Sequence, residues 1–236
     1  MPRGRPRGPT TSKKTYAPNR KTFVKKGKYQ ARQQSLVKMI KSIALGQAET
    51  KRIITAQENQ NVYHNTPGIL YNLLATSQSN SQSGRIGDEV IAQYLKLKLW
   101  LSNKSDRPNV MWRVIVYCPR PGTSIIDWQS GSATNRILAV VDTDKLNLKS
   151  QKILNPPPGD YSIESGAALK ERSRYLALNI NVKGQKVSYF TDNDTVPKLQ
   201  KHNICVAIIA YDAYGTLITD NIASYAYSYE FYFKDT

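Results

Sequence analysis

A two-residue alternation of side chains is the feature that most constrains the fold of this chain. Over residues 91–101 the odd positions are mostly leucine, and the even positions are mostly polar or aromatic. Because successive side chains of a β-strand point to opposite faces, this period predicts one long strand. The alternation puts Ile91 and Gln93 on its core side and Ala92 and Tyr94 on its other side.

Four further segments strengthen the prediction of a β protein. Apolar residues occupy the even positions of 110–118 and of 176–182, while five aromatic residues occupy the odd positions of 225–233. The run Ile204 to Tyr211 is continuously apolar, which is typical of a strand that is covered on both faces.

Weaker signals complete the expected sheet. Further strands are predicted at residues 52–57, 69–74, 137–141, 151–154 and 186–190, with short helical insertions at 123–129 and 165–171. The connections 155–165 and 192–203 are long and polar, which favours Greek-key crossings over a simple meander. The fold class predicted for residues 50–236 is therefore all-β, a single eight-stranded antiparallel jelly-roll sandwich.

The positive charge of the chain is concentrated in its N-terminal segment, outside the region of alternating apolar residues. The first 41 residues hold thirteen of the 34 Lys and Arg residues, and the first acidic residue is Glu49, so most of the net charge of +17 is N-terminal. Residues 1–30 are rich in Gly, Pro, Ser and Thr, and such a segment buries too little apolar surface to offset its chain entropy. We expect a disordered arm that binds nucleic acid by neutralising phosphates. The predicted binding residues are Arg3, Arg5, Arg7, Lys13, Lys14, Arg20, Lys21, Lys25, Lys26, Lys28, Arg32, Lys38 and Lys41.

A short amphipathic helix is predicted between the arm and the sandwich, at residues 31–46. Leu36, Met39, Ile40 and Ile43 recur at helical spacing, and Gly46 is the expected stop. Two interpretations of the apolar stripe stay open: the helix packs on its own domain, or it packs against copies of itself at an assembly axis.

The arm also carries two more specific patterns. The segment Pro2 to Pro6 resembles the core of an AT-hook, whose arginines lie in the minor groove of A·T tracts. The basic pairs at 13–14, 20–21 and 25–26 are typical of a nuclear import signal, which implies a host import receptor as a partner. Aromatic residues are few in the arm, so packing a phosphate backbone fits it better than stacking on bases.

Catalysis and cofactor binding find little support in the sequence. The only histidines are His64 and His202, and no nucleophile elbow, zinc helix, phosphate loop or dinucleotide turn occurs. We expect no enzyme activity and no cofactor. The acidic residues at 192–194 do not complete a calcium loop, and Asp142 and Asp144 fit solvated strand-end acids better than metal ligands.

Two further expectations concern cysteine and membranes. Cys118 and Cys205 lie in apolar strands without metal-ligand spacing, which predicts buried free thiols. No apolar run approaches the roughly 18 residues of a membrane span, and no secretory signal follows the N-terminal charges, so membrane insertion and secretion are not expected.

The order of these features resembles a known family. The segment Gly84-Arg85-Ile86-Gly87-Asp88-Glu89-Val90, which leads into the leucine strand, is similar to an R-x-G-D motif before the first long core strand of certain viral coat proteins. The helix at Met39-Ile40-Lys41, the strand from Trp112 to Tyr117 and the Tyr-rich final strand also match in order. The chain thus resembles the single jelly-roll coat proteins of small circular single-stranded DNA (CRESS-DNA) viruses and of satellite tobacco necrosis virus.

The resemblance implies a self-assembling T=1 icosahedral capsid of sixty identical subunits, with the arm inward and the loops outward. Sixty arms would supply about 780 positive charges, enough to neutralise much of a small single-stranded genome. The implied genome is circular single-stranded DNA, and the implied locations are the virion and, during assembly, the host nucleus. The alternative is a non-capsid DNA-binding protein whose AT-hook-like arm tethers a β-sandwich interaction domain.

Overall fold

The computed structural model describes residues 33–40, 43, 46–79, 81, 83–107, 109–131, 134–156, 172–190, 199–200, 203–214 and 216–235. The chain separates into two compact units, Met1–Gln47 and Ala48–Thr236, and each is described by itself.

The first unit contains the predicted helix. Residues 33–40 are helical, as are the described positions 43, 46 and 47. Gly46 therefore lies within the helix and does not end it, contrary to the prediction. The apolar side chains of Leu36, Met39, Ile40 and Ile43 are all more than half exposed.

The second unit consists of nine β-strands in its described residues. Their bounds are β1 (Thr50–Tyr63), β2 (Pro67–Leu70), β3 (Glu89–Asn103), β4 (Met111–Pro119), β5 (Leu146–Leu154), β6 (Ser173–Ile180), β7 (Lys186–Ser188), β8 (Cys205–Tyr211) and β9 (Asn221–Asp235).

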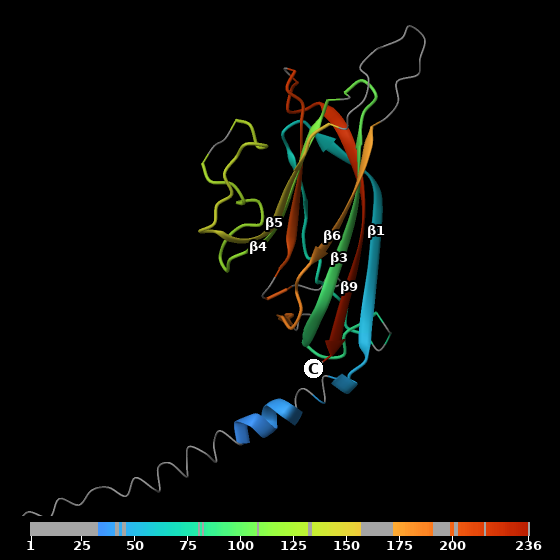
Figure 1. The fold of residues 1–236 in the computed structure, drawn as a ribbon, viewed down its shortest axis with the longest axis vertical. Coiled ribbons are helices and arrows are strands. Elements are labelled where there is room, and N and C mark those ends of the chain that lie inside the picture. Colours follow the sequence, from blue (N-terminus) through green and yellow to red (C-terminus); the bar gives the residue numbers. More distant parts are fainter. Residues whose placement is uncertain are drawn as a thin grey trace, which may run out of the picture. The chain divides into compact units, whose positions relative to one another are not determined.

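The strands form two antiparallel sheets packed as a sandwich (Figure 1). The first has the order β1-β9-β3-β6, with β7 also paired to β3, and the second has the order β2-β8-β4-β5. The pairs β4–β5, β3–β6, β2–β8 and β1–β9 are nested, because each joins strands progressively further apart in the sequence. The strand count exceeds the predicted eight because β6 and β7 pair with successive stretches of β3, residues 95–102 and 89–91.

The main core lies between the two sheets. Leu95, Leu97, Leu99 and Leu101 of β3 are completely buried and belong to one apolar cluster with residues of β4, β8 and β9. Complete burial of each such side chain stabilises the fold by about 1.5–3 kcal/mol. The aromatic strand behaves as predicted, with Phe231 and Phe233 completely buried.

A β-bulge corrects the predicted faces of β3. The register of β3 with β9 shifts between Ala92 and Tyr94. Val90 and Ala92 are completely buried, whereas the core side after the shift begins at Leu95. The prediction that Ile91 and Gln93 face the core while Ala92 faces away was wrong, because an extra residue in one strand reverses the alternation.

A second, smaller core covers the outer face of the four-stranded sheet. It joins Ile115 and Tyr117 of β4 and Cys205, Ala207 and Ile209 of β8 to Trp128, Ile137 and Ala139 of the long β4–β5 connection. Figure 1 shows this connection in yellow-green beside β4 and β5. The prediction that 204–211 is covered on both faces is confirmed, since its residues 204–210 are completely buried.

The β4–β5 connection itself was predicted incorrectly. Residues 123–129 contain one turn, at 125–126, and no helix, and residues 136–138 form a turn where a strand was expected. The alternation at 137–141 is real, because Ile137 and Ala139 are buried while Leu138 and Val140 are exposed. It arises from a segment lying on a sheet, anchored by the Arg113 guanidinium, which donates to the carbonyls of residues 136, 137 and 139.

Other strand bounds differ by a few residues. β1 continues to Tyr63, well past the predicted 57, while β2 begins at Pro67 and stops at Leu70. Asn72 then adopts a φ of 55°, a left-handed conformation that ends the predicted 69–74 strand. β6 ends at Ile180, β5 begins at Leu146, and β7 stops at Ser188. The predicted insertion at 165–171 and most of the two long connections lie outside the described residues.

Candidate nucleic-acid interface

Twelve of the thirteen predicted binding residues lie in parts of the chain that the structure does not describe. Arg3, Arg5, Arg7, Lys13, Lys14, Arg20, Lys21, Lys25, Lys26, Lys28, Arg32 and Lys41 lie outside the described residues. Lys38 lies on the helix and is exposed.

The described residues contain a second cationic surface, on the outer face of the five-stranded sheet. Strand register sets Arg52 of β1 opposite Tyr232 of β9, which lies opposite Tyr94 of β3. Further along β3, on the same face, come Lys96, Lys98 and Trp100, with Glu230 of β9 and Tyr175 of β6 beside them. We call this surface the aromatic face; its members are Arg52, Tyr94, Lys96, Lys98, Trp100, Tyr175, Glu230 and Tyr232.

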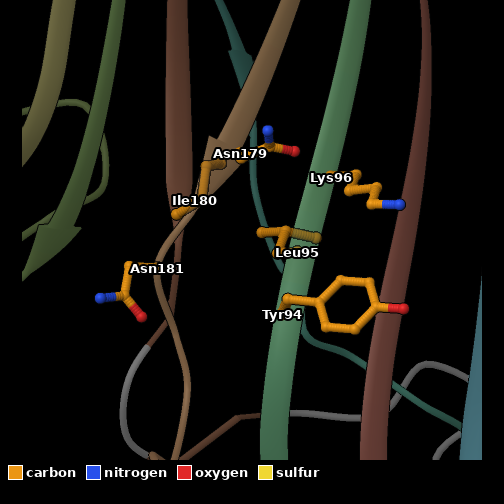
Figure 2. A pocket seen from close by; sticks show the side chains of 6 residues that line it. All are labelled: Tyr94, Leu95, Lys96, Asn179, Ile180 and Asn181. Carbon is orange, nitrogen blue, oxygen red and sulfur yellow. The ribbon is translucent and has the colours of Figure 1, made fainter.

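Its centre is a stacked pair of tyrosines. The ring centroids of Tyr94 and Tyr232 are 4.0 Å apart, with an angle of 27° between the ring planes. The Lys96 Nζ atom lies 5.2 Å from the Tyr94 centroid and 5.8 Å from the Tyr232 centroid. Figure 2 shows that the side chains of Tyr94 and Lys96 both extend from β3 toward β9. The Arg52 Cζ atom is 6.0 Å from the Tyr232 centroid, so cations approach the ring pair from two strands.

One carboxylate lies among these cations. Glu230 accepts a hydrogen bond of 2.8 Å from the Tyr232 hydroxyl, and its Oε1 is 3.4 Å from Lys98 Nζ. The Tyr232 hydroxyl and then Lys98 lower the pKa of Glu230 below its ordinary value, so the group stays ionised at neutral pH. Arg52 and Lys96 form no ion pair with a carboxylate of the described residues.

Two open hollows flank the tyrosine pair. The first, about 360 Å³, is lined by Tyr94, Lys96, Asn179 and Asn181 near the end of β6 (Figure 2). The second, about 660 Å³, is lined by residues that include Tyr232, Arg52, Ser81 and Ser83. The wall of the first hollow also includes Leu95 and Ile180, and that of the second also includes Glu49 and Lys51. Each hollow thus offers a tyrosine, a cation and neutral polar side chains to a planar polar ligand next to an anion.

Sequence reasoning missed this surface. The spacing Tyr94-x-Lys96-x-Lys98-x-Trp100 was visible, but one strand supplies only part of the site. Arg52 and Tyr232 join it through strands that are far apart in the sequence, and only the register shows that they are neighbours.

The R-x-G-D segment has a structural role. The Arg85 side chain is buried, donates to the carbonyls of Thr76 and Gly87 and to Asp88, and lies 4.5 Å from the centroid of Tyr189. A Cβ atom at Gly84 would lie 2.7 Å from the backbone oxygen of Ser79, so a larger residue does not fit.

The segment also ties the strand ends together. Lys51 of β1 donates to the Gly84 carbonyl at 2.8 Å and forms a 2.8 Å ion pair with Asp235 of β9. Asp235 in turn accepts a hydrogen bond from the backbone amide of Ile86.

The histidine and acidic residues that the sequence offered as catalytic or metal-binding candidates make contacts that stabilise the fold, where the structure describes them. His64 is buried, its Nδ1 accepts the backbone amide of Asp212 at 3.2 Å, and burial lowers its pKa. Asp142 accepts the backbone amides of Asp144 and Lys145 and so closes a turn. His202 and the acidic residues at 192–194 lie outside the described residues.

Cys118 and Cys205 are free and buried, as predicted. Across the described ranges, no three His, Cys, Asp or Glu residues gather in a way that could hold a metal ion. The helices in those same ranges include none that is both long and apolar enough to cross a membrane.

Comparison with known proteins gives no relative: no family model matches the chain, and no curated protein is significantly similar to it in sequence.

Proposed function

We propose that this chain is the coat protein of a small virus, which assembles into an icosahedral shell and packages a single-stranded genome through its basic arm. The genome proposed is circular single-stranded DNA. The shell proposed has sixty subunits, and assembly takes place in the host nucleus, where the basic pairs of the arm direct the protein. The main support is the strand order of the sandwich combined with a charge that is concentrated in the N-terminal segment.

The nested strand pairing supports a jelly roll. A chain that folds back on itself as one long hairpin pairs its first strand with its last and its middle strands with each other. Wrapping such a hairpin produces two four-stranded sheets of the kind found in viral capsid domains, lectins and cupins. Taking β6 and β7 as one interrupted strand, the orders β1-β9-β3-β6 and β2-β8-β4-β5 fit this scheme.

The charge distribution favours a capsid within that group. Lectins and cupins bind small ligands in sites on the sandwich, which require no polycationic extension. Here thirteen Lys and Arg residues precede the first acid, and the rest of the chain carries 21 basic against 17 acidic residues. A polycationic segment on a nearly neutral body binds polyanions by counterion release, whatever their sequence.

Exposed apolar side chains support self-association. Leu36, Met39, Ile40 and Ile43 expose an apolar stripe on the helix. On the sandwich, Leu138 and Val140 are each more than 70% exposed. Apolar residues gathered on an otherwise polar surface mark contact sites between proteins.

The alternative is a DNA-binding protein whose arm reads A·T tracts and whose sandwich binds another protein. The Pro2 to Pro6 segment is its support, and it requires no shell.

Negative-stain microscopy and light scattering separate the two functions. We expect the full chain to form uniform shells that contain nucleic acid, and the chain without residues 1–41 to lose the nucleic acid. A monomer or dimer at every salt concentration would overturn the capsid proposal. Competition between A·T-rich and G·C-rich duplexes would then test the alternative.

A further inference from the structure

We propose that the aromatic face binds unpaired nucleobases, with Tyr94 and Tyr232 as the stacking surface and Arg52 and Lys96 as the phosphate contacts. The inference rests on the proposed function only in requiring that the protein binds nucleic acid. It assigns a second contact to that nucleic acid, separate from the arm, and it specifies a single strand.

The first step is the chemistry of the surface. Tyr94 is 39%, Trp100 51% and Tyr175 58% exposed, although each could have been a polar residue on a solvated sheet face. Exposed rings on the outer face of a sheet offer a platform on which bases can stack. Cations within 6 Å of the Tyr94 and Tyr232 centroids place a phosphate partner next to each ring.

The second step is charge. Arg52, Lys96 and Lys98 share the aromatic face with one carboxylate, Glu230, which is paired with Lys98, and a second carboxylate, Glu49, lines the hollow beside Arg52. The surface around the tyrosine pair is therefore positive, which is complementary to a phosphate backbone and unfavourable for an acidic partner.

The third step is the choice of a single strand. Bases of a duplex are stacked on each other and present only their edges in the grooves, so an aromatic ring cannot stack on them without unwinding the helix. The two hollows beside the tyrosine pair have amide or hydroxyl side chains, Asn179 and Asn181 in one and Ser81 and Ser83 in the other. Such groups can donate to and accept from the edge of an unpaired base.

The surface supplies what the arm lacks. Residues 1–41 contain thirteen cations but only three aromatic residues, so this segment favours phosphates without regard to bases. The aromatic face would add an attraction that depends on the bases and that persists at salt concentrations where counterion release is weak.

The test compares the full-length protein on three probes, under buffer conditions where light scattering shows dispersed subunits. The probes are a 12-nucleotide oligothymidylate, an abasic oligonucleotide of the same length and charge, and a 12-base-pair duplex. We expect the oligothymidylate to bind about tenfold more tightly than the abasic probe, from stacking of one or two bases. Tyr94→Ala and Tyr232→Ala should each reduce this ratio toward one while leaving the abasic and duplex affinities unchanged.

Two control variants check the cause. Tyr94→Phe keeps the ring and should keep the ratio. Tyr214→Ala removes a tyrosine that is 75% exposed in the β8–β9 connection, outside the aromatic face, and should also leave the ratio unchanged. Equal affinity of the unmodified protein for the oligothymidylate and the abasic probe would overturn the proposal. So would an equal loss for all three probes in Tyr94→Ala, because that pattern indicates lost charge or lost structure.

A measurement without mutation covers the case in which the variants fold poorly. The other two tryptophans, Trp112 and Trp128, are at most 2% exposed, so Trp100 is the one that a solution ligand can reach. Quenching of its fluorescence by oligothymidylate but not by the abasic probe supports stacking on this face, and identical responses to both contradict it. Shell formation and abasic binding by the arm are independent of these results, so failure here leaves the capsid proposal standing.

Discussion

The two sheets of the sandwich differ in how far their outer faces are covered. The outer face of the four-stranded sheet is sealed by the β4–β5 connection, which adds a second apolar core around Trp128. The outer face of the five-stranded sheet carries the aromatic face, where Tyr94, Trp100 and Tyr175 are open to solvent. A sandwich needs only its inner faces to fold. The contrast therefore teaches that one outer face serves stability, and that the other is available for a ligand.

The cationic side chains on the two outer faces also differ in burial. Arg113, on the sealed face, is buried; its guanidinium is bound to backbone carbonyls and lies 5.5 Å from the Trp128 ring. Burial lowers its pKa. On the open face Arg52 and Lys96 lie beside the rings of Tyr94 and Tyr232 and remain accessible to an anion. On the four-stranded sheet, Arg113 holds the β4–β5 connection in place. On the five-stranded sheet, the cations are exposed to solvent.

The largest expected effect compares two tryptophans, one on each face. Trp128→Ala removes a side chain that is 1% exposed and should lower the free energy of unfolding by about 3–5 kcal/mol, through lost burial and a cavity. Trp100→Ala removes one that is 51% exposed and should cost about 1 kcal/mol or less. Urea denaturation measures both. Similar losses for the two variants would erase the distinction between the sealed and the open face.

A smaller effect concerns alkaline pH and the sealed face. Burial raises the pKa of Cys205 to about 12. The unfolded chain releases this proton near pH 9, whereas the folded chain retains it. The stability present below pH 9 is therefore lost as pH rises toward 12, by about 1 kcal/mol at pH 10.

The check on the thiol is urea denaturation between pH 7 and pH 10. Cys205→Ala should show a shallower decline in stability than the unmodified protein. Unchanged slopes would mean that the thiol is accessible to solvent in the folded state. A thiol reagent offers a second check, since Cys205 should react only after unfolding.

The smallest effect on stability concerns Glu230 on the open face. Its folded pKa is lowered, so the stability that it provides is present above its ordinary pKa, near pH 4.5, and is lost as pH falls through the folded value. Glu230→Gln should therefore change stability at pH 7 by less than about 1 kcal/mol and flatten the acid limb of the stability curve.

The same variant should strengthen binding of oligothymidylate modestly, because it removes the one carboxylate of the aromatic face. Weaker binding in Glu230→Gln would show that Glu230 positions Tyr232 and Lys98 more than it repels phosphate. Lys98→Gln is the matched variant: it removes a positive charge from the same face and should weaken binding of oligothymidylate.

Prediction from the sequence succeeded where one strand carries its own signal. The leucines of β3 from Leu95 onward, the even positions of β4, and Tyr225, Phe231 and Phe233 of β9 are buried as their alternation indicated. Tyr227 and Tyr229 are partly buried against the same core. The alternation predicted the wrong faces for the residues near Ala92, because the single extra residue of a β-bulge cannot be recognised in an alternating sequence. It failed again at 137–141, where alternation reflects a segment packed on a sheet and not a strand within it.

By itself, the sequence determined that the body of the chain is mainly β and that a cationic segment precedes it, because alternation and charge are local properties of the chain. Only the tertiary structure decided which outer face is covered, and which residues share the face that is not. Arg52, Tyr94 and Tyr232 become neighbours through the pairing of β1 and β3 with β9. That pairing is set by packing the whole core at once, and no short stretch of sequence contains it.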